Sequence, residues 1–196
     1  MSKLESQLQF LLEIDKVKGI LRQSVILGDT KRRENDAEHS WHMAICAMVL
    51  KEYVELNNIN MEKVLKMILI HDLVEIYAGD IPAYAVFSQE DKTKKEMEAA
   101  EKIFSFLPME QKKEFMNLWL EFDSLETNDA KYANVFDRFQ GFMQNITSDG
   151  HTWRKFNPSR EMVINRMKPI AMYAPIVYKE IVYKKINEYI EKGIIK

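Results

Sequence analysis

A histidine and an aspartate stand side by side, as His71 and Asp72, inside a strongly apolar stretch from position 64 to position 74. Burial of such polar groups is costly unless each group finds a partner. An imidazole and a carboxylate together suit a borderline or hard divalent metal ion. The pair is therefore a candidate half of a metal site, although a buried histidine beside an aspartate is more often a hydrogen-bonded pair within a protein core.

Two further residues can complete a metal site. His39 lies on the predicted helix before the pair and Asp137 on a later one, so the four side chains come from three predicted helices. On an α-helix, positions 71 and 72 are about 100° apart with a rise of about 1.5 Å, so both side chains can lean toward one ion. The predicted site is a cleft between helices, where helical bundles often bind metals.

More acidic residues follow the pair. Glu75 lies four positions after His71 and three after Asp72, so a helix would place it on their face. Asp80 follows at the expected end of the same helix. The C-terminal end of a helix is its negative pole, which disfavours a cluster of carboxylates there. A bound cation, a nearby arginine, or both would relieve that repulsion.

The elements that must position these residues are predicted to be helices. Glycine and proline number only 6 and 5, apolar residues recur with helical periodicity, and alternating strand patterns are absent. We therefore expect one all-α domain over residues 1–196. The expected helices span about 4–24, 36–56, 61–78, 88–107, 108–122, 129–148, 158–172 and 175–192, with a polar loop over 28–35 and a break at 150–151.

Several of these helices have capping signals. Asn35 or Asp36 is a suitable N-cap for the second helix, with Glu38 placed to complete a capping box. Asn60 and Ser88 are expected to cap the third and fourth helices. Gly79 and Pro82 should end the helix that carries His71, Pro108 should open a helix, and Pro169 should kink or end one.

Composition excludes several classes of function. A net charge of −2 over 196 residues gives no support for binding to nucleic acid or to an anionic membrane. No apolar run approaches the roughly 18 residues of a membrane span, and the first residues lack the pattern of a signal peptide. The single cysteine, Cys46, lies among apolar residues and is better explained by burial than by nucleophilic chemistry. We expect a cytoplasmic protein.

Three segments resemble one enzyme family. They are Glu38-His39-Ser40, the run from 71 to 82 with the sequence HDLVEIYAGDIP, and Asp137-Arg138. They resemble the HD-domain metal-dependent phosphohydrolases, and residues 32–40 narrow the resemblance to bacterial 5′-deoxynucleotidases and relatives of the HD-domain-containing protein 2 type. The resemblance covers about residues 8–150 and implies an HD-type helical bundle. The helices over about 158–192 would then pack on that core or form a dimer contact.

The resemblance also implies roles for individual residues. One divalent ion (Mn, Co, Mg, Fe or Zn) would be bound by His39, His71, Asp72 and Asp137. Glu75 would act as the acid/base or water-positioning residue, and Asp80 would support the attacking water or leaving group and contact substrate. Arg22 would contact the substrate. Apart from the resemblance, Arg22 and either Arg32 or Arg33, of which we select Arg33, would hold the substrate phosphate, because no glycine-rich phosphate loop is present. Gln23 stands where the deoxynucleotidases have a tryptophan that shapes the sugar pocket, which leaves sugar selectivity open.

The function that follows is hydrolysis of nucleoside 5′-monophosphates, deoxyribonucleotides foremost, to nucleoside and phosphate. Alternatives are another phosphate ester, such as a nucleoside triphosphate, a cyclic dinucleotide or an alarmone, and a non-catalytic nucleotide-binding regulator. The family resemblance implies a homodimer. The tyrosine-rich C-terminal helices could form its contact or could serve ordinary core packing; these tyrosines are Tyr173, Tyr178, Tyr183 and Tyr189.

Overall fold

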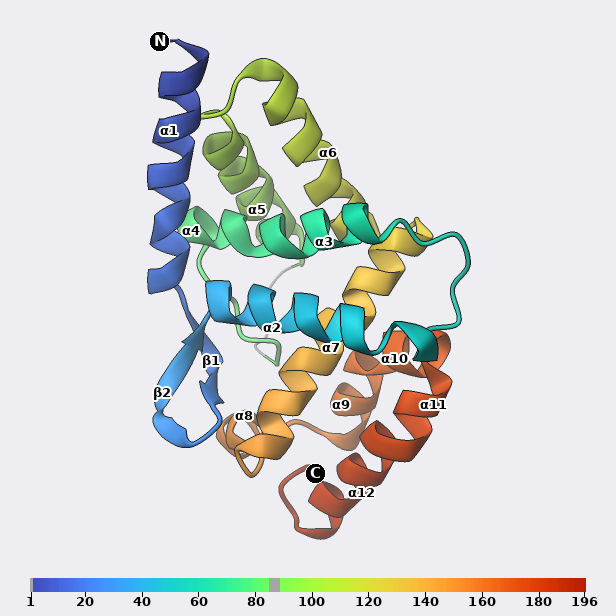
Figure 1. Ribbon diagram of the computed structural model, residues 1–196. Helices are drawn as coiled ribbons and strands as arrows, with labels where there is room; N and C mark the ends of the chain where they lie inside the picture. The colour runs from blue at the N-terminus through green and yellow to red at the C-terminus, as the bar shows by residue number, and fades with distance from the viewer. Residues whose placement is uncertain (1, 85–88) are drawn as a thin grey trace.

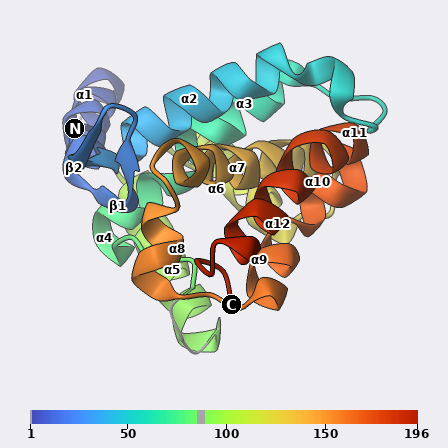
Figure 2. The same cartoon turned by 90° about the horizontal axis from the view of Figure 1, so that it is seen from below.

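Helix α7 (Asn128–Thr147) is the central element of the computed structural model, which describes residues 2–84 and 89–196 (Figure 1). Seen from below, α7 lies between α2 and α3 on one side and the C-terminal helices on the other (Figure 2). The other helices are α1 (Lys3–Ile14), α2 (Asp36–Val49), α3 (Met61–Ile70), α4 (Glu75–Ala78), α5 (Gln89–Phe104), α6 (Met109–Ser124), α8 (His151–Phe156), α9 (Arg160–Arg166), α10 (Lys168–Tyr173), α11 (Pro175–Val177) and α12 (Tyr183–Glu191).

Two apolar clusters surround α7. One joins α7 to α2 and the C-terminal helices, with Phe142 and Trp153 fully buried. The other joins α1, α5 and α6, with Phe104 at its centre. Helix α3 contributes to both, because Ile68 packs in the first cluster and Met67 in the second. The chain that leaves α3 therefore enters the region between two packed cores.

The first forty residues differ from the sequence prediction. Helix α1 ends at Ile14, a 3-10 turn runs over Asp15–Gly19, and a hairpin of β1 (Leu21–Ile26) and β2 (Asp29–Asn35) follows. The helix expected over 4–24 and the loop expected over 28–35 are therefore wrong from residue 15 onward. Gly28 takes a positive φ of 87° at the hairpin turn, and the branched Val25 is buried on the inner side of β1. Both features favour a hairpin over a continued helix.

The helix expected over 61–78 is interrupted. Helix α3 ends at Ile70, residues His71–Val74 form a 3-10 turn, and the short α4 ends before Gly79, whose φ is +78°. A 3-10 turn has about three residues per turn, so it changes the directions in which neighbouring side chains point. Upstream, the predicted N-caps are confirmed. Asn35 and Glu38 form the capping box of α2, and the Asn60 side chain accepts from the backbone N–H of Lys63.

The C-terminal third is more segmented than the sequence pattern suggests. Residues 151–156, which were expected to follow a break, form α8. The segment around Pro169 is divided between α9 and α10 as predicted, and a π turn over Tyr178–Val182 precedes α12. Helix α6 begins directly after Pro108, as expected. The N-cap predicted at Ser88 lies outside the described residues.

Gly150 has a specific packing role. Its φ is +73°, and a Cβ at this position would lie 3.1 Å from Tyr189 Cε1 and 3.2 Å from Ile194 Cγ2. The turn between α7 and α8 therefore touches the end of the chain. Gly28 has the same backbone handedness, with open space where a Cβ would be.

This contrast predicts different costs for the same substitution. Gly28→Ala should lower the free energy of unfolding by about 1–2 kcal/mol through backbone strain alone. Gly150→Ala should lower the free energy of unfolding by about 1–3 kcal/mol more than Gly28→Ala does, because overpacking adds to the backbone strain. Denaturant unfolding of the two variants measures the difference, and equal losses would contradict the packing role of Gly150.

Candidate metal centre

Three of the predicted ligands meet in the structure. One ligand atom each from His39, His71 and Asp72 can be chosen so that all lie within 4.8 Å of one another, and the two histidines are buried. Nε2 of His71 is 3.1 Å and Nε2 of His39 is 3.8 Å from Oδ2 of Asp72. Oδ1 of Asp137 lies 3.3 Å from Nε2 of His39. The arrangement brings together the four residues that the sequence singled out.

The hydrogen bonds of the two imidazoles show that these residues fit a metal ion. Nδ1 of His39 lies 2.6 Å from Oε1 of Gln140, and Nδ1 of His71 lies 2.8 Å from the carbonyl oxygen of Ile68. Both partners are acceptors, so a neutral ring carries its proton on Nδ1 and presents a lone pair at Nε2. Both Nε2 atoms are buried and lack a hydrogen-bond partner. Two imidazole nitrogens and carboxylate oxygens converging in this way form a donor set that fits a divalent metal ion.

A buried carboxylate fixes the orientation of the Gln140 side chain. Oε1 of Glu34, on β2, accepts hydrogen bonds from Nε2 of Gln140 at 2.6 Å and Nε2 of Gln144 at 2.7 Å. Its Oε2 accepts from the hydroxyl of Ser24 at 2.8 Å. With its NH₂ group held by Glu34, Gln140 must direct its oxygen toward His39. Glu34 thereby supports the tautomer of His39 in which Nε2 is free to bind a metal.

Sequence reasoning did not identify Glu34 or Gln140 as part of the site. A usable signal existed for Gln140, because it lies three positions after Asp137 and therefore shares its helical face. Gln144 continues that face one turn later. Polar residues on a buried face of α7 are unusual enough to indicate a hydrogen-bonded network.

Arg22 reaches the centre from a strand rather than from the helix end that was predicted. It belongs to β1, and its Nη1 donates to Oδ2 of Asp72 at 2.7 Å and to Oδ1 of Asp36 at 3.2 Å. Asp36 is fully buried at the start of α2, and burial together with the charge of Asp72 raises its pKa to about 7. Arg22 thus compensates part of the negative charge gathered around the candidate metal ligands.

The two predicted catalytic acids lie beside this cluster. Oε2 of Glu75 and Oδ2 of Asp80 are buried atoms without a hydrogen-bond partner. Burial, followed by the charges of Asp72 and Asp36, raises the pKa of Glu75 to about 11. Burial also raises the pKa of Asp80, although Arg22 opposes the shift. A cation bound nearby would favour the ionised form of both groups.

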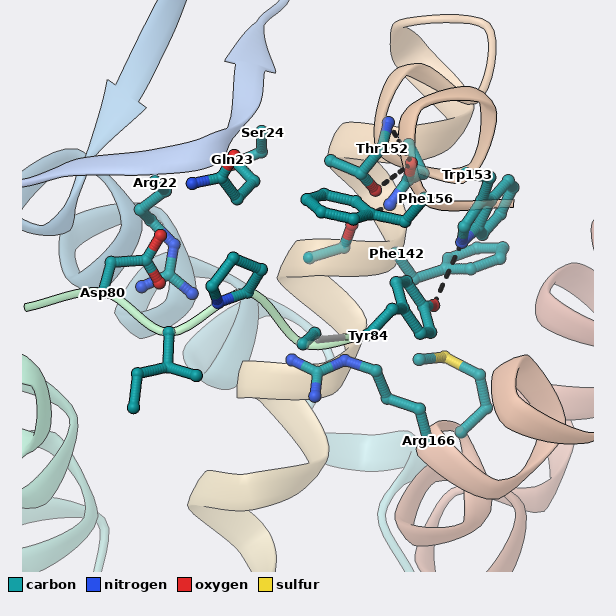
Figure 3. A pocket seen from close by; sticks show the side chains of 16 residues that line it. Arg22, Gln23, Ser24, Asp80, Tyr84, Phe142, Thr152, Trp153, Phe156 and Arg166 are labelled. Carbon is teal, nitrogen blue, oxygen red and sulfur yellow. Dashed lines mark hydrogen bonds between the residues drawn. The ribbon is translucent and has the colours of Figure 1, made fainter. Parts of the chain in front are cut away.

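Two cavities that share lining residues lie beside the cluster. The larger, of about 310 Å³, is lined by His71, Asp72, Glu75 and Asp137 and by residues of α5 and α6. The smaller, of about 90 Å³, has aromatic walls, which Figure 3 shows as Tyr84, Phe142, Trp153 and Phe156. Both cavities are bordered by Arg22, residues 80–83 and Arg166. A ligand at this border would touch the acidic cluster and the aromatic walls together.

Of three other residues near the centre, two line these cavities and one does not. Gln23 lines the smaller cavity, and its Oε1 accepts a hydrogen bond from Nζ of Lys155 at 2.8 Å. Arg138 lines the larger cavity and pairs with Oδ2 of Asp137 at 3.0 Å. Arg33 donates to backbone carbonyl groups within the hairpin, and in the described part of the chain it lines neither cavity. Its predicted contact with phosphate would require this side chain to leave the hairpin.

Proteins similar in sequence to this chain include several enzymes. The human 5′-deoxynucleotidase HDDC2 is 30% identical over 139 residues, which are 71% of this chain and 66% of that protein. The 5′-deoxynucleotidase hdd1 of Schizosaccharomyces pombe is 28% identical over 165 residues, covering 82% of this chain and 79% of that protein. The match to the human relative thus spans about two thirds of that relative's length.

Solved structures give a similar result over the whole chain. A predicted metal-dependent phosphohydrolase from Magnetospirillum magnetotacticum has a TM-score of 0.87 and 37% identity, covering 100% of this chain and 99% of that one. An HD-domain phosphohydrolase from Listeria innocua, 18% identical with a TM-score of 0.65, shares the fold. The family model described as HD domain matches residues 14–175. This chain therefore belongs to the HD domain family.

Proposed function

We propose that this protein is a metal-dependent phosphohydrolase that converts nucleoside 5′-monophosphates, deoxyribonucleotides foremost, to nucleoside and phosphate. The observation that carries the proposal is the meeting of two buried imidazole Nε2 atoms, which lack hydrogen-bond partners, with the carboxylates of Asp72 and Asp137 beside a cavity. The names of the relatives support this substrate class over a nucleoside triphosphate, a cyclic dinucleotide or an alarmone. They also favour an enzyme over a non-catalytic nucleotide-binding regulator.

The proposed metal ligands are His39, His71, Asp72 and Asp137. A divalent ion bound there would acidify water and neutralise charge on phosphate oxygens. Glu75, one turn after the ligands and facing the same cavity, would accept the proton of the attacking water. Asp80, at the border of the two cavities, would orient that water or protonate the leaving alkoxide. Arg22 would hold Asp72 in position and offer its remaining N–H groups to the substrate.

The substrate's place follows from the two cavities. The phosphate would lie in the larger cavity, near the metal ligands, and the nucleoside would extend toward the aromatic walls of the smaller one. Gln23 would meet the sugar, because it lines that smaller cavity beside Arg22.

None of the helices that the structure describes combines the length and apolar character needed to cross a membrane. We also propose a cytoplasmic location.

The first test separates metal binding from turnover. Phosphate release should be measured across ribo- and deoxyribonucleoside monophosphates with Mn²⁺, Co²⁺ and Mg²⁺. Asp72→Ala should lose bound metal and activity together, whereas Glu75→Gln should retain metal and lose activity by about 100-fold or more. Glu62→Gln, at an exposed position of α3, is the control and should match the wild type. A wild-type protein that binds no metal and releases no phosphate would contradict the proposal.

A second test concerns the hydrogen bond that orients His39. Gln140→Met keeps the side-chain volume and removes the acceptor at Nδ1, so the affinity for metal should fall by about 10- to 100-fold. Titration with Mn²⁺ under competition by a chelator measures this change. Gln111→Met, whose side chain bonds Gln7 at a distant site, should leave metal affinity unchanged. Equal affinities in all three proteins would show that His39 does not depend on Gln140.

We further propose a homodimer whose contact is formed by helix α2. Among the C-terminal tyrosines, Tyr189 is 4% exposed and packs in the core, so it offers no surface to a second copy, whereas Tyr183 is 43% exposed. Helix α2, by contrast, exposes a stripe of large apolar side chains at Trp41, Ile45 and Met48, with Trp41 65% exposed. These positions are spaced by four and three residues and share one face of the helix. A second copy of the chain would bury that stripe.

Trp41→Glu should weaken this dimer. Light scattering should give about twice the 23.2 kDa chain mass for the wild type and the single-chain mass for the variant. Met172→Glu replaces an equally exposed apolar residue on α10 and should stay dimeric. A monomeric wild type at all accessible concentrations would remove the proposal, and a dimeric Trp41→Glu would place the contact elsewhere.

A further inference from the structure

Arg166 is the last residue of α9, in a part of the chain to which the sequence assigned no chemistry. Its side chain borders both cavities, as do Arg22 and Asp80. Figure 3 shows it reaching in from α9 below Tyr84, whereas Arg22 enters from the hairpin on the other side. The two guanidinium groups thus approach the border of the cavities from separate elements.

The guanidinium group of Arg166 forms no direct contact with a carboxylate in the described part of the chain, whereas those of Arg22 and Arg138 do. Arg22 donates to the carboxylates of Asp72 and Asp36, and Arg138 pairs with Asp137. Within residues 2–84 and 89–196, the Arg166 side chain makes no ion pair or hydrogen bond. Burial and the nearby positive charge of Arg138 lower its pKa to about 10, which still leaves it cationic at neutral pH.

Asp137 attracts the charge of Arg166, but this carboxylate already pairs directly with Arg138, whose positive charge repels Arg166. A partly buried cation without a direct ion pair is unfavourable. An anion in the cavity would relieve both the burial cost and the repulsion. The planar guanidinium group matches two oxygens of a phosphate with parallel hydrogen bonds. A phosphate at the border of the cavities would have the metal ligands on one side and α9 on the other.

We propose that Arg166 binds the phosphate group of the substrate, opposite the metal ligands. This inference rests on the proposed function, because it assigns a residue to the same site. Arg166 would take the phosphate-binding role that was predicted for Arg33. The guanidinium group of Arg33 instead donates hydrogen bonds within the hairpin. This role of Arg166 also gives the C-terminal third of the chain a direct part in substrate binding.

The test measures binding rather than turnover. Calorimetry should compare inorganic phosphate and deoxyadenosine as ligands of the Mn²⁺-loaded full-length protein. Arg166→Met should weaken phosphate binding by about 10-fold or more, leaving Mn²⁺ affinity and deoxyadenosine binding unchanged. Arg166→Lys should retain part of the phosphate affinity. Arg160→Met, at an exposed position of the same helix, is the matched control and should behave as the wild type.

Thermal unfolding shows whether each variant is folded, and Arg166→Met should stay folded because the burial cost and the repulsion from Arg138 are removed together with the attraction to Asp137. Unchanged phosphate affinity in Arg166→Met would overturn the inference. The inference would also be overturned if Arg166→Met lost deoxyadenosine binding but retained phosphate affinity, because that result would place Arg166 at the base. A wild type that binds phosphate through Arg166 yet hydrolyses no monophosphate would contradict the proposed function and leave this inference standing.

Discussion

The structure is organised around a buried group of acceptor atoms that repel one another unless a cation lies between them. Nδ1 of His39 and Nδ1 of His71 each lie against an acceptor outside the group, so the Nε2 atoms of both rings face the carboxylates of Asp72 and Asp137. Such a group is stable only if the surrounding helices hold it rigidly. The central position of α7, between two apolar cores, supplies that rigidity.

Local sequence signals predicted the parts of this arrangement that depend on local chemistry. The caps at Asn35 and Asn60 are properties of a few adjacent residues, and both are present. The ligand residues were identified because a histidine and an aspartate in an apolar run are conspicuous. Their convergence in space could be expected only through the family resemblance, since spacing along separate helices does not determine how those helices cross.

The errors arise where tertiary packing decides between local alternatives. Residues 15–26 contain apolar positions that suit a helix, yet the hairpin buries Val25 and brings Glu34 to Gln140. No local sequence pattern encodes the contact between Glu34 and Gln140. Arg166 lies more than ninety positions from His71 and Asp72, and only the packing of α9 beside the cavities brings it to the site. The 3-10 turn at 71–74 likewise reflects the junction of two cores rather than any residue that breaks helices.

The β-hairpin supports the centre through both of its strands. Arg22 on β1 holds Asp72 directly, and Glu34 on β2 acts on His39 through Gln140. Two candidate ligands, one in the 3-10 turn and one on α2, therefore depend on one small element that is otherwise largely exposed. Binding energies and local order are linked reciprocally, so an ion bound at the centre would also stabilise the hairpin against opening. Backbone hydrogen exchange in residues 21–35 would then report on metal occupancy from outside the site, without any ligand residue being altered.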